Sequence, residues 1–169
     1  MEKITSETFR PIRLILKQYF HNHSVKIVRE ELPVDRYRPT MAYRPLDDQI
    51  NIHPRVTPHR LDVPDYYWRL VHEVIHSTGH PSRLGRPSIE SFTSAFFGPS
   101  EEEYIGEELF TEHVNRLIFQ YFGLEEAVAP FQLPYMAVWE LRRRDMGLAL
   151  PKEADVRRTV GYLLTGGKQ

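Results

Sequence analysis

The sequence contains no cysteine. This absence excludes a disulfide framework, a thiolate zinc site, an iron–sulfur cluster and a cysteine nucleophile. Long apolar runs are missing as well, because the longest of them, Tyr135 to Trp139, is far too short to span a bilayer. The segment from Met1 to Lys17 carries spaced charges and no apolar signal-peptide core. We therefore expect a soluble, cytoplasmic protein without membrane contact.

The chain also lacks an excess of charge of either sign. Its 22 Lys and Arg residues nearly balance 23 Asp and Glu residues, which gives a net charge of −1. Since nucleic-acid binding depends on neutralising many phosphates, this balance makes no general electrostatic case for it. The arginine clusters at 142–144 and 157–158 are typical of solvated, ion-paired helix faces, with a local nucleic-acid patch as the alternative.

The length of 169 residues, with 41% hydrophobic and 27% charged residues, fits a single globular domain. We expect one domain over 1–169, with a motif core at about 41–122 and C-terminal helices at about 135–165. The fold class expected is α+β, mostly helical with a small sheet. The apolar periodicity predicts a first helix that begins at a Ser6 cap and further helices over Asp65–Thr78, Ser100 to about Phe122, Tyr135–Met146 and Ala154–Leu164. It predicts strands at Val25–Val28, Met41–Tyr43 and Gln49–His53.

Glycine and proline mark the expected ends of these elements. Gly79 is predicted to end the second helix in a left-handed conformation. Loops are expected at 31–40 and 81–100, and Pro130 and Pro134 predict a linker before the helix that begins at Tyr135. Ser100 and Glu103 have the spacing of a capping box.

The helix expected over Asp65–Thr78 contains the pattern H-E-x-x-H at His72, Glu73 and His76. Histidines at i and i+4 lie on one face of a helix, so both imidazoles can reach a single metal ion. Glu73 is rotated by about 100° from His72 and can remove a proton from a metal-bound water. The alternative interpretation is a solvated or salt-bridged His/Glu face on an ordinary helix.

A catalytic zinc site needs a third protein ligand. Some metallopeptidases with this motif use a histidine ten residues after the first, but Ser82 stands there and His80 comes too early. Others use a glutamate from a later helix, and Glu108 fits this role, with Glu112 behind it to accept a ring N–H from a ligand histidine. Glu107 remains the competing ligand.

Four side chains could donate a hydrogen bond to a developing oxyanion, and the sequence does not choose among them: His80, Arg83, Tyr104 and His113. His53, at the end of the strand before the motif helix, could face the cleft. That strand, Gln49–His53, is expected to lie beside the motif helix and to offer its edge to an extended peptide.

The stretch from about Ala42 to Leu164 resembles the zincin-like metallopeptidase domain of ArdC-type antirestriction proteins and phage polyvalent proteins. The matching pieces are Tyr66-Tyr67 before the His72-Glu73-x-x-His76 motif, the run Ser77–Leu84, Glu107-Glu108-Leu109-x-x-Glu112, Tyr135-x-Ala137-x-Trp139 and a last helix ending Gly161–Leu164. The resemblance implies a glutamate-liganded zincin fold in which His72, His76 and Glu108 bind zinc and Glu73 is the catalytic carboxylate. It also implies a setting in phages or mobile elements.

We predict a zinc-dependent metallopeptidase that hydrolyses a peptide or protein substrate. Two rival hypotheses remain at this stage. The first is a zincin scaffold that binds DNA or a host-defence protein without proteolysis, and the second is a metal-free helical bundle. The intact Glu73 disfavours the first rival, because a purely structural zinc site needs no base.

Overall fold

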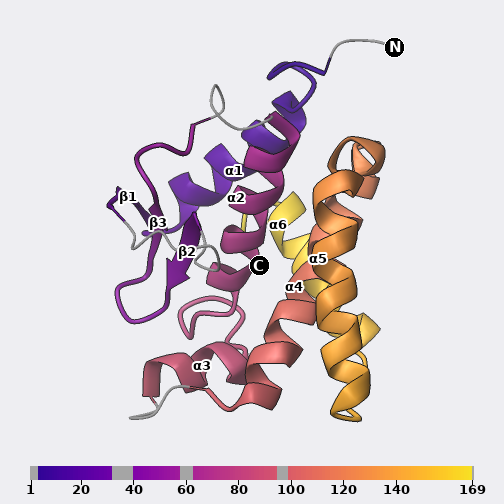
Figure 1. Ribbon diagram of the computed structural model, residues 1–169. Helices are drawn as coiled ribbons and strands as arrows, with labels where there is room; N and C mark the ends of the chain where they lie inside the picture. Colours follow the sequence, from indigo (N-terminus) through magenta and orange to yellow (C-terminus); the bar gives the residue numbers. More distant parts are fainter. Residues whose placement is uncertain (1–3, 32–39, 58–62, 95–98, 169) are drawn as a thin grey trace.

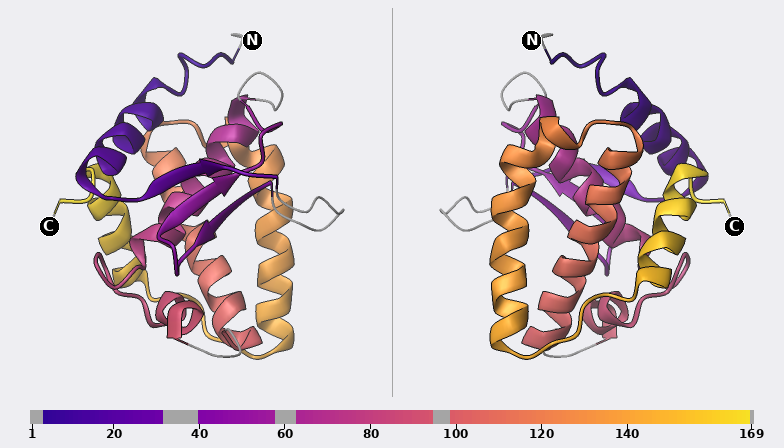
Figure 2. Two further views of the ribbon diagram at one scale, coloured as in Figure 1. Left: turned by 90° about the vertical axis from the view of Figure 1, so that its left-hand side faces the viewer. Right: turned by 90° about the vertical axis from the view of Figure 1, so that its right-hand side faces the viewer.

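A computed structural model describes residues 4–31, 40–57, 63–94 and 99–168 (Figure 1). Six helices and a small sheet of three strands make up this described part, so the α+β class is confirmed. Helix α2 (Val63–Thr78) lies between the sheet on one side and helices α4 (Glu101–Tyr121) and α5 (Glu125–Asp145) on the other (Figure 1). Figure 2 shows the sheet in front of the helices in its left view, and α4 and α5 in front in its right view. No helix in these described ranges is long and apolar enough to cross a membrane.

The N-terminal segment forms helix α1 (Arg10–Asn22), in which Ile12, Leu16 and Tyr19 are buried. The predicted cap at Ser6 is wrong: the N-cap residue is Phe9, which makes no side-chain cap, and Ser6 lies in the preceding turn. Burial of the Phe9 ring against Tyr67 and Phe119 fixes this helix end in place of a polar cap.

The strands β1 (Lys26–Arg29), β2 (Met41–Arg44) and β3 (Gln49–Ile52) pair in the order β1-β3-β2. Strand β3 is parallel to β1 and antiparallel to β2, with Tyr43 opposite Ile50. Both edges of β3 are therefore paired, and the expectation that this strand offers its edge to a peptide is wrong. The edge strand beside the motif helix is β2, which contacts α2.

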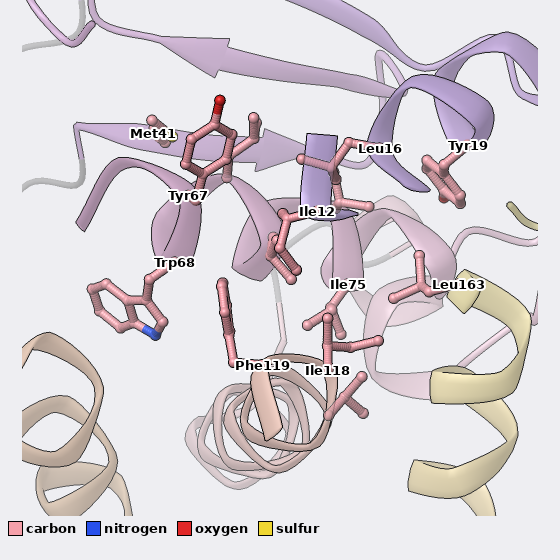
Figure 3. Close-up of a cluster of buried hydrophobic side chains, with 14 of the residues drawn as sticks. Ile12, Leu16, Tyr19, Met41, Tyr67, Trp68, Ile75, Ile118, Phe119 and Leu163 are labelled. Carbon is pink, nitrogen blue, oxygen red and sulfur yellow. The ribbon is translucent and has the colours of Figure 1, made fainter. Parts of the chain in front are cut away.

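Helix α2 is buried along nearly its whole length. Its apolar side, including Ile75, packs with α1, with Ile118 and Phe119 of α4 and with Leu163 near the end of α6 (Glu153–Leu164) (Figure 3). Gly79 follows the helix without a positive φ, so the predicted left-handed termination is wrong. A Cβ at this position would lie 2.6 Å from Ile89 Cγ1, and close packing is therefore what requires glycine here.

Two predictions about loops are also wrong. The segment expected to be a loop at 81–100 contains helix α3 (Pro87–Ser94), anchored by buried Ile89. The expected linker through Pro130 and Pro134 lies inside the continuous helix α5. Both prolines are exposed, so water can hydrogen-bond the carbonyl groups that they leave unpaired, while buried Val128 and Trp139 hold the helix against the core.

The boundaries of helices α4 and α6 lie close to those predicted from the sequence. Ser100 and Glu103 form the predicted capping box of α4, and α6 begins one residue before the expected position. The expected loop at 31–40 lies almost wholly outside the described residues.

Candidate metal centre

His72, Glu73 and His76 of α2 and Glu108 of α4 come together at the interface of the two helices. All four side chains are buried, with exposed fractions of 5 to 9%. The Nε2 atoms of His72 and His76 are 3.0 Å apart. The Glu108 carboxylate lies 3.3 Å from Nε2 of His72 and 3.6 Å from Nε2 of His76. In the described part of the chain, these two histidines and Glu108 form a group able to hold a metal ion.

The other ring nitrogen of each histidine faces a carboxylate. Nδ1 of His72 lies 2.7 Å from Oε1 of Glu112, and Nδ1 of His76 lies 3.1 Å from Oε1 of Glu107. A carboxylate accepts hydrogen bonds, so both Nδ1 atoms carry the proton and donate. In the neutral rings, the two Nε2 lone pairs then point toward each other and toward Glu108, an arrangement that a cation between them stabilises.

The separations suit a tetrahedral ion. Two ligand atoms at about 2.1 Å from such an ion lie about 3.4 Å apart, and the three separations measured here are 3.0, 3.3 and 3.6 Å. Two imidazoles and one carboxylate are also a donor set typical of zinc in hydrolases. The residues present therefore fit a zinc ion.

The surroundings carry a strong negative charge for a buried site. Glu73, Glu107, Glu108 and Glu112 are all buried. Arg86 compensates one of them, since its guanidinium donates to Glu107 at 2.6 Å. Burial alone would raise the pKa of Glu107, but Arg86 and His76 outweigh it and lower the pKa to about 2. Glu107 is therefore fixed as an anion behind His76, and its carboxylate is committed to Nδ1 of that ring and to Arg86.

The same carboxylates act on the histidines. Burial lowers the pKa of His76, but its hydrogen bonds with Glu107 and Glu108 prevail and raise it to about 9. For His72, Glu108 and Glu112 likewise outweigh burial and raise the pKa. Both rings thus sit where positive charge is favoured, whether a proton or a metal ion supplies it.

Glu73 lies beside the histidine pair. Its Oε2 accepts a hydrogen bond of 2.7 Å from the backbone N–H of Tyr43 on β2. Burial raises the pKa of Glu73 despite the nearby histidines. A carboxylate with a raised pKa, held in place by an edge strand, is suited to accept a proton from a nearby water.

These groups line a cleft of about 730 Å³. One wall is β2, with Met41, Ala42 and Tyr43, and the other wall is aromatic, formed by side chains of α2, α4 and α5: Trp68, Tyr104, Tyr135 and Trp139. The Tyr135 hydroxyl donates to Oε2 of Glu108 at 2.8 Å. Sequence reasoning gave Tyr135 no role at the site, because it lies 27 positions after Glu108 and no helical spacing links the two.

The other residues that the sequence suggested for the site differ in whether they line the cleft. Tyr104 lines the cleft, whereas His80, Arg83, His113 and His53 do not. Arg83 is buried against Asp48 and donates to the Ser77 carbonyl, and Nδ1 of His80 contacts Ser82.

Two of the comparisons with known proteins found a match. A solved structure described as the antirestriction ArdC protein from the R388 plasmid, in a metal-free form, is similar with 24% identity and a TM-score of 0.44, and the match covers 90% of this chain and 46% of that chain. The chain thus spans less than half of that protein. No curated protein matches. A family model described as a zincin-like metallopeptidase matches residues 22–145. The chain therefore belongs to the zincin-like metallopeptidase family, as its motifs predicted.

Proposed function

We propose that the protein is a zinc-dependent metallopeptidase in which His72, His76 and Glu108 hold the ion. The observation that carries this proposal is the pair of Nε2 atoms 3.0 Å apart, each on a ring whose Nδ1 already faces a carboxylate. Glu107 is not the third ligand in this proposal, because its oxygens are engaged with His76, Arg86 and Ser88.

Zinc in such a site polarises a carbonyl and lowers the pKa of water, which makes hydrolysis possible near neutral pH. Glu73 acts as the general base: it takes a proton from the attacking water and passes it to the leaving amine. Its raised pKa and its hydrogen bond from Tyr43 support this role, since they favour proton uptake by a carboxylate of fixed orientation.

The position of β2 supports a peptide as the substrate. Met41, Ala42 and Tyr43 line the cleft, and among the described strands β2 stands at the edge of the sheet and pairs with β3 alone. An extended peptide can add to such an edge through main-chain hydrogen bonds. We infer that a peptide segment lies along β2 with its scissile bond next to Glu73.

The test combines metal content with turnover. Protein purified without added zinc is analysed for bound metal, and zinc-loaded protein is incubated with a library of unstructured peptides. We expect one zinc per chain and cleavage that is lost in the Glu73→Gln variant. His80→Ala is the matched control, because His80 lies outside the cleft and its loss leaves both results unchanged. Stoichiometric zinc with no cleavage of any peptide would favour the non-proteolytic binding scaffold instead.

A further inference from the structure

The three consecutive arginines of α5 have different environments. Arg143 and Arg144 both form ion pairs with Glu140 on the same helix, at 2.8 and 3.1 Å. Arg142 instead lines the cleft, and its guanidinium carbon lies 5.3 Å from the centre of the Trp139 ring. Among the described residues, no carboxylate forms an ion pair with Arg142 and no acceptor takes a hydrogen bond from it. Two arginines of the run therefore belong to an ion-paired helix face, while the third brings an uncompensated positive charge to the cleft.

A second arginine lines the cleft, and it differs from Arg142 in its charge balance. Arg69 on α2 lies over the Trp68 ring at the same distance of 5.3 Å. Its Nε donates a hydrogen bond of 2.8 Å to Oδ1 of Asp65, one helical turn earlier. Each guanidinium is thus held against an indole ring, but within the described part of the chain only that of Arg142 lacks a carboxylate partner.

The surroundings of Arg142 suit an acidic side chain. Contact with Trp139 restricts the flexible arginine, and a guanidinium over an aromatic face keeps its N–H edge available for two parallel hydrogen bonds to a carboxylate. Val138, one helical turn earlier, also lines the cleft and is 53% exposed. The methylene groups of an aspartate or glutamate can therefore lie on an apolar surface next to the guanidinium.

The aromatic wall relates Arg142 to the metal centre. The rings of His72, Tyr135 and Trp139 follow one another at 5.6 and 5.7 Å, and the guanidinium follows at 5.3 Å. Since an extended peptide advances about 3.3 Å per residue, Arg142 can reach a side chain within about five residues of a bond placed at His72. The four buried carboxylates around the histidines repel an acidic side chain at the inner end of the cleft. The acidic residue therefore belongs at the Arg142 end.

We propose that Arg142 is a specificity-determining residue, which binds an aspartate or glutamate of the peptide within about five residues of the scissile bond. The inference rests on the proposed function and names its substrate class, an acidic peptide segment. Nucleic acid suits the cleft less well, because binding a polyanion depends on neutralising many phosphates. Among the described residues that line the cleft, Arg142 is the one arginine without an ion pair.

The experiment measures peptide binding separately from cleavage. Fluorescein-labelled Ala/Ser peptides carry one central Phe, and Glu, Gln or Lys is placed at each flanking position in turn. Dissociation constants are measured by fluorescence anisotropy with zinc-loaded Glu73→Gln protein, which leaves the peptides intact, and kcat/KM is measured with zinc-loaded wild type. Arg142→Gln and Arg142→Glu are made in both backgrounds. Arg144→Gln is the matched control, since it removes the same charge from the same helix but outside the cleft.

At one flanking position we expect the Glu peptide to bind about 5- to 10-fold more tightly than the Gln peptide, with a matching difference in kcat/KM. Arg142→Gln should abolish this difference, and Arg142→Glu should reverse it so that the Lys peptide binds best. Arg144→Gln and Arg69→Gln should keep the preference for Glu. Added salt should weaken the preference, because the contact is exposed to solvent.

Three results would overturn the assignment. These are equal affinities for the Glu, Gln and Lys peptides at every position, a preference for Glu that survives Arg142→Gln, and no binding of any peptide. Displacement of the bound Glu peptide by a single-stranded oligonucleotide in wild type but not in Arg142→Gln would assign Arg142 to nucleic acid instead. Binding that depends on Arg142 without cleavage by wild type would contradict the proposed hydrolysis and support the acidic-peptide site.

Discussion

The two helical sides of the metal centre are built in different ways. On the α2 side, His72, Glu73 and His76 come from a single helical stretch, and the spacing along that helix decides which side chains face one another. On the other side, α4 and α5 supply Glu107, Glu108, Glu112 and Tyr135, and the packing between helices decides what each of them touches. Local periodicity therefore predicts the first side, while the second needs the tertiary structure.

Glu107 and Glu108 show the difference most clearly. They are neighbours in the sequence, and the sequence left both open as the third ligand. Glu108 faces the Nε2 atoms of the two histidines, whereas Glu107 faces Nδ1 of His76 and is clamped by Arg86. Successive residues of a helix are rotated by about 100° about its axis, so Glu108 points to the ligand position while Glu107 points to the outer side of His76.

The largest expected effect is that of Glu108→Ala. Removing a direct ligand leaves two histidines, and we expect loss of stoichiometric zinc and of all hydrolysis, beyond the 10- to 100-fold weakening typical of an outer partner. Metal analysis after dialysis checks the first result and a peptide assay the second. Loss of zinc in Glu107→Ala with retention in Glu108→Ala would show that Glu107 is the third ligand.

The Glu73→Gln variant tests peptide hydrolysis separately from zinc binding. The amide can still accept the hydrogen bond from the Tyr43 backbone, so we expect normal folding and full zinc occupancy. Since an amide cannot act as a base, the rate should fall by about 10² to 10⁴. Initial rates at saturating peptide give the measurement, and a drop of less than about tenfold would speak against Glu73 as the base.

Glu107 and Glu112, the two orienting carboxylates of α4, are tested by removing their charge. We expect Glu112→Gln and Glu107→Gln each to lower zinc affinity by about 10- to 100-fold, since each weakens the acceptor of an Nδ1–H. Competition with a chelator compares the two variants directly. An affinity unchanged in both would show that the Nδ1 contacts do not orient the ligands.

The smallest effect at the zinc site is expected from Asp48→Asn, on the turn between β2 and β3. Burial raises the pKa of Asp48, but hydrogen bonds from Arg83 and Tyr43 outweigh it, so the folded-state pKa is lowered. The Arg83 side chain is only 2% exposed, and losing its carboxylate partner should cost about 2 kcal/mol at pH 7.

The stabilisation of the fold by Asp48 depends on pH. A lowered folded-state pKa means that the stabilisation by Asp48 is complete above the unfolded value of about 3.9 and is lost as the pH falls through the folded value. Urea unfolding should therefore show a wild-type advantage at pH 7 that shrinks under strongly acidic conditions. Zinc affinity should change by no more than about twofold, and a larger change would link this turn to the metal centre.

The parts of the fold that the sequence predicted share a local origin. The capping box of Ser100 and Glu103 and the span of α2 depend on residues a few positions apart. The part of helix α5 before Tyr135 was missed because Pro130 and Pro134 disfavour a helix locally, while burial of Val128 and Trp139 stabilises the continuous helix through tertiary contacts. Tyr135 went unassigned for the same reason, as its partner Glu108 lies on another helix.

The central claim is that His72, His76 and Glu108 hold a zinc ion. X-ray diffraction at the zinc absorption edge, on crystals of the zinc-loaded protein, tests it most directly. The account predicts one anomalous peak per chain, bonded to Nε2 of both histidines and to a Glu108 oxygen, with Glu107 and Glu112 still on the Nδ1 atoms. A peak bonded to Glu107 or His80, or no peak in this cleft, would contradict it.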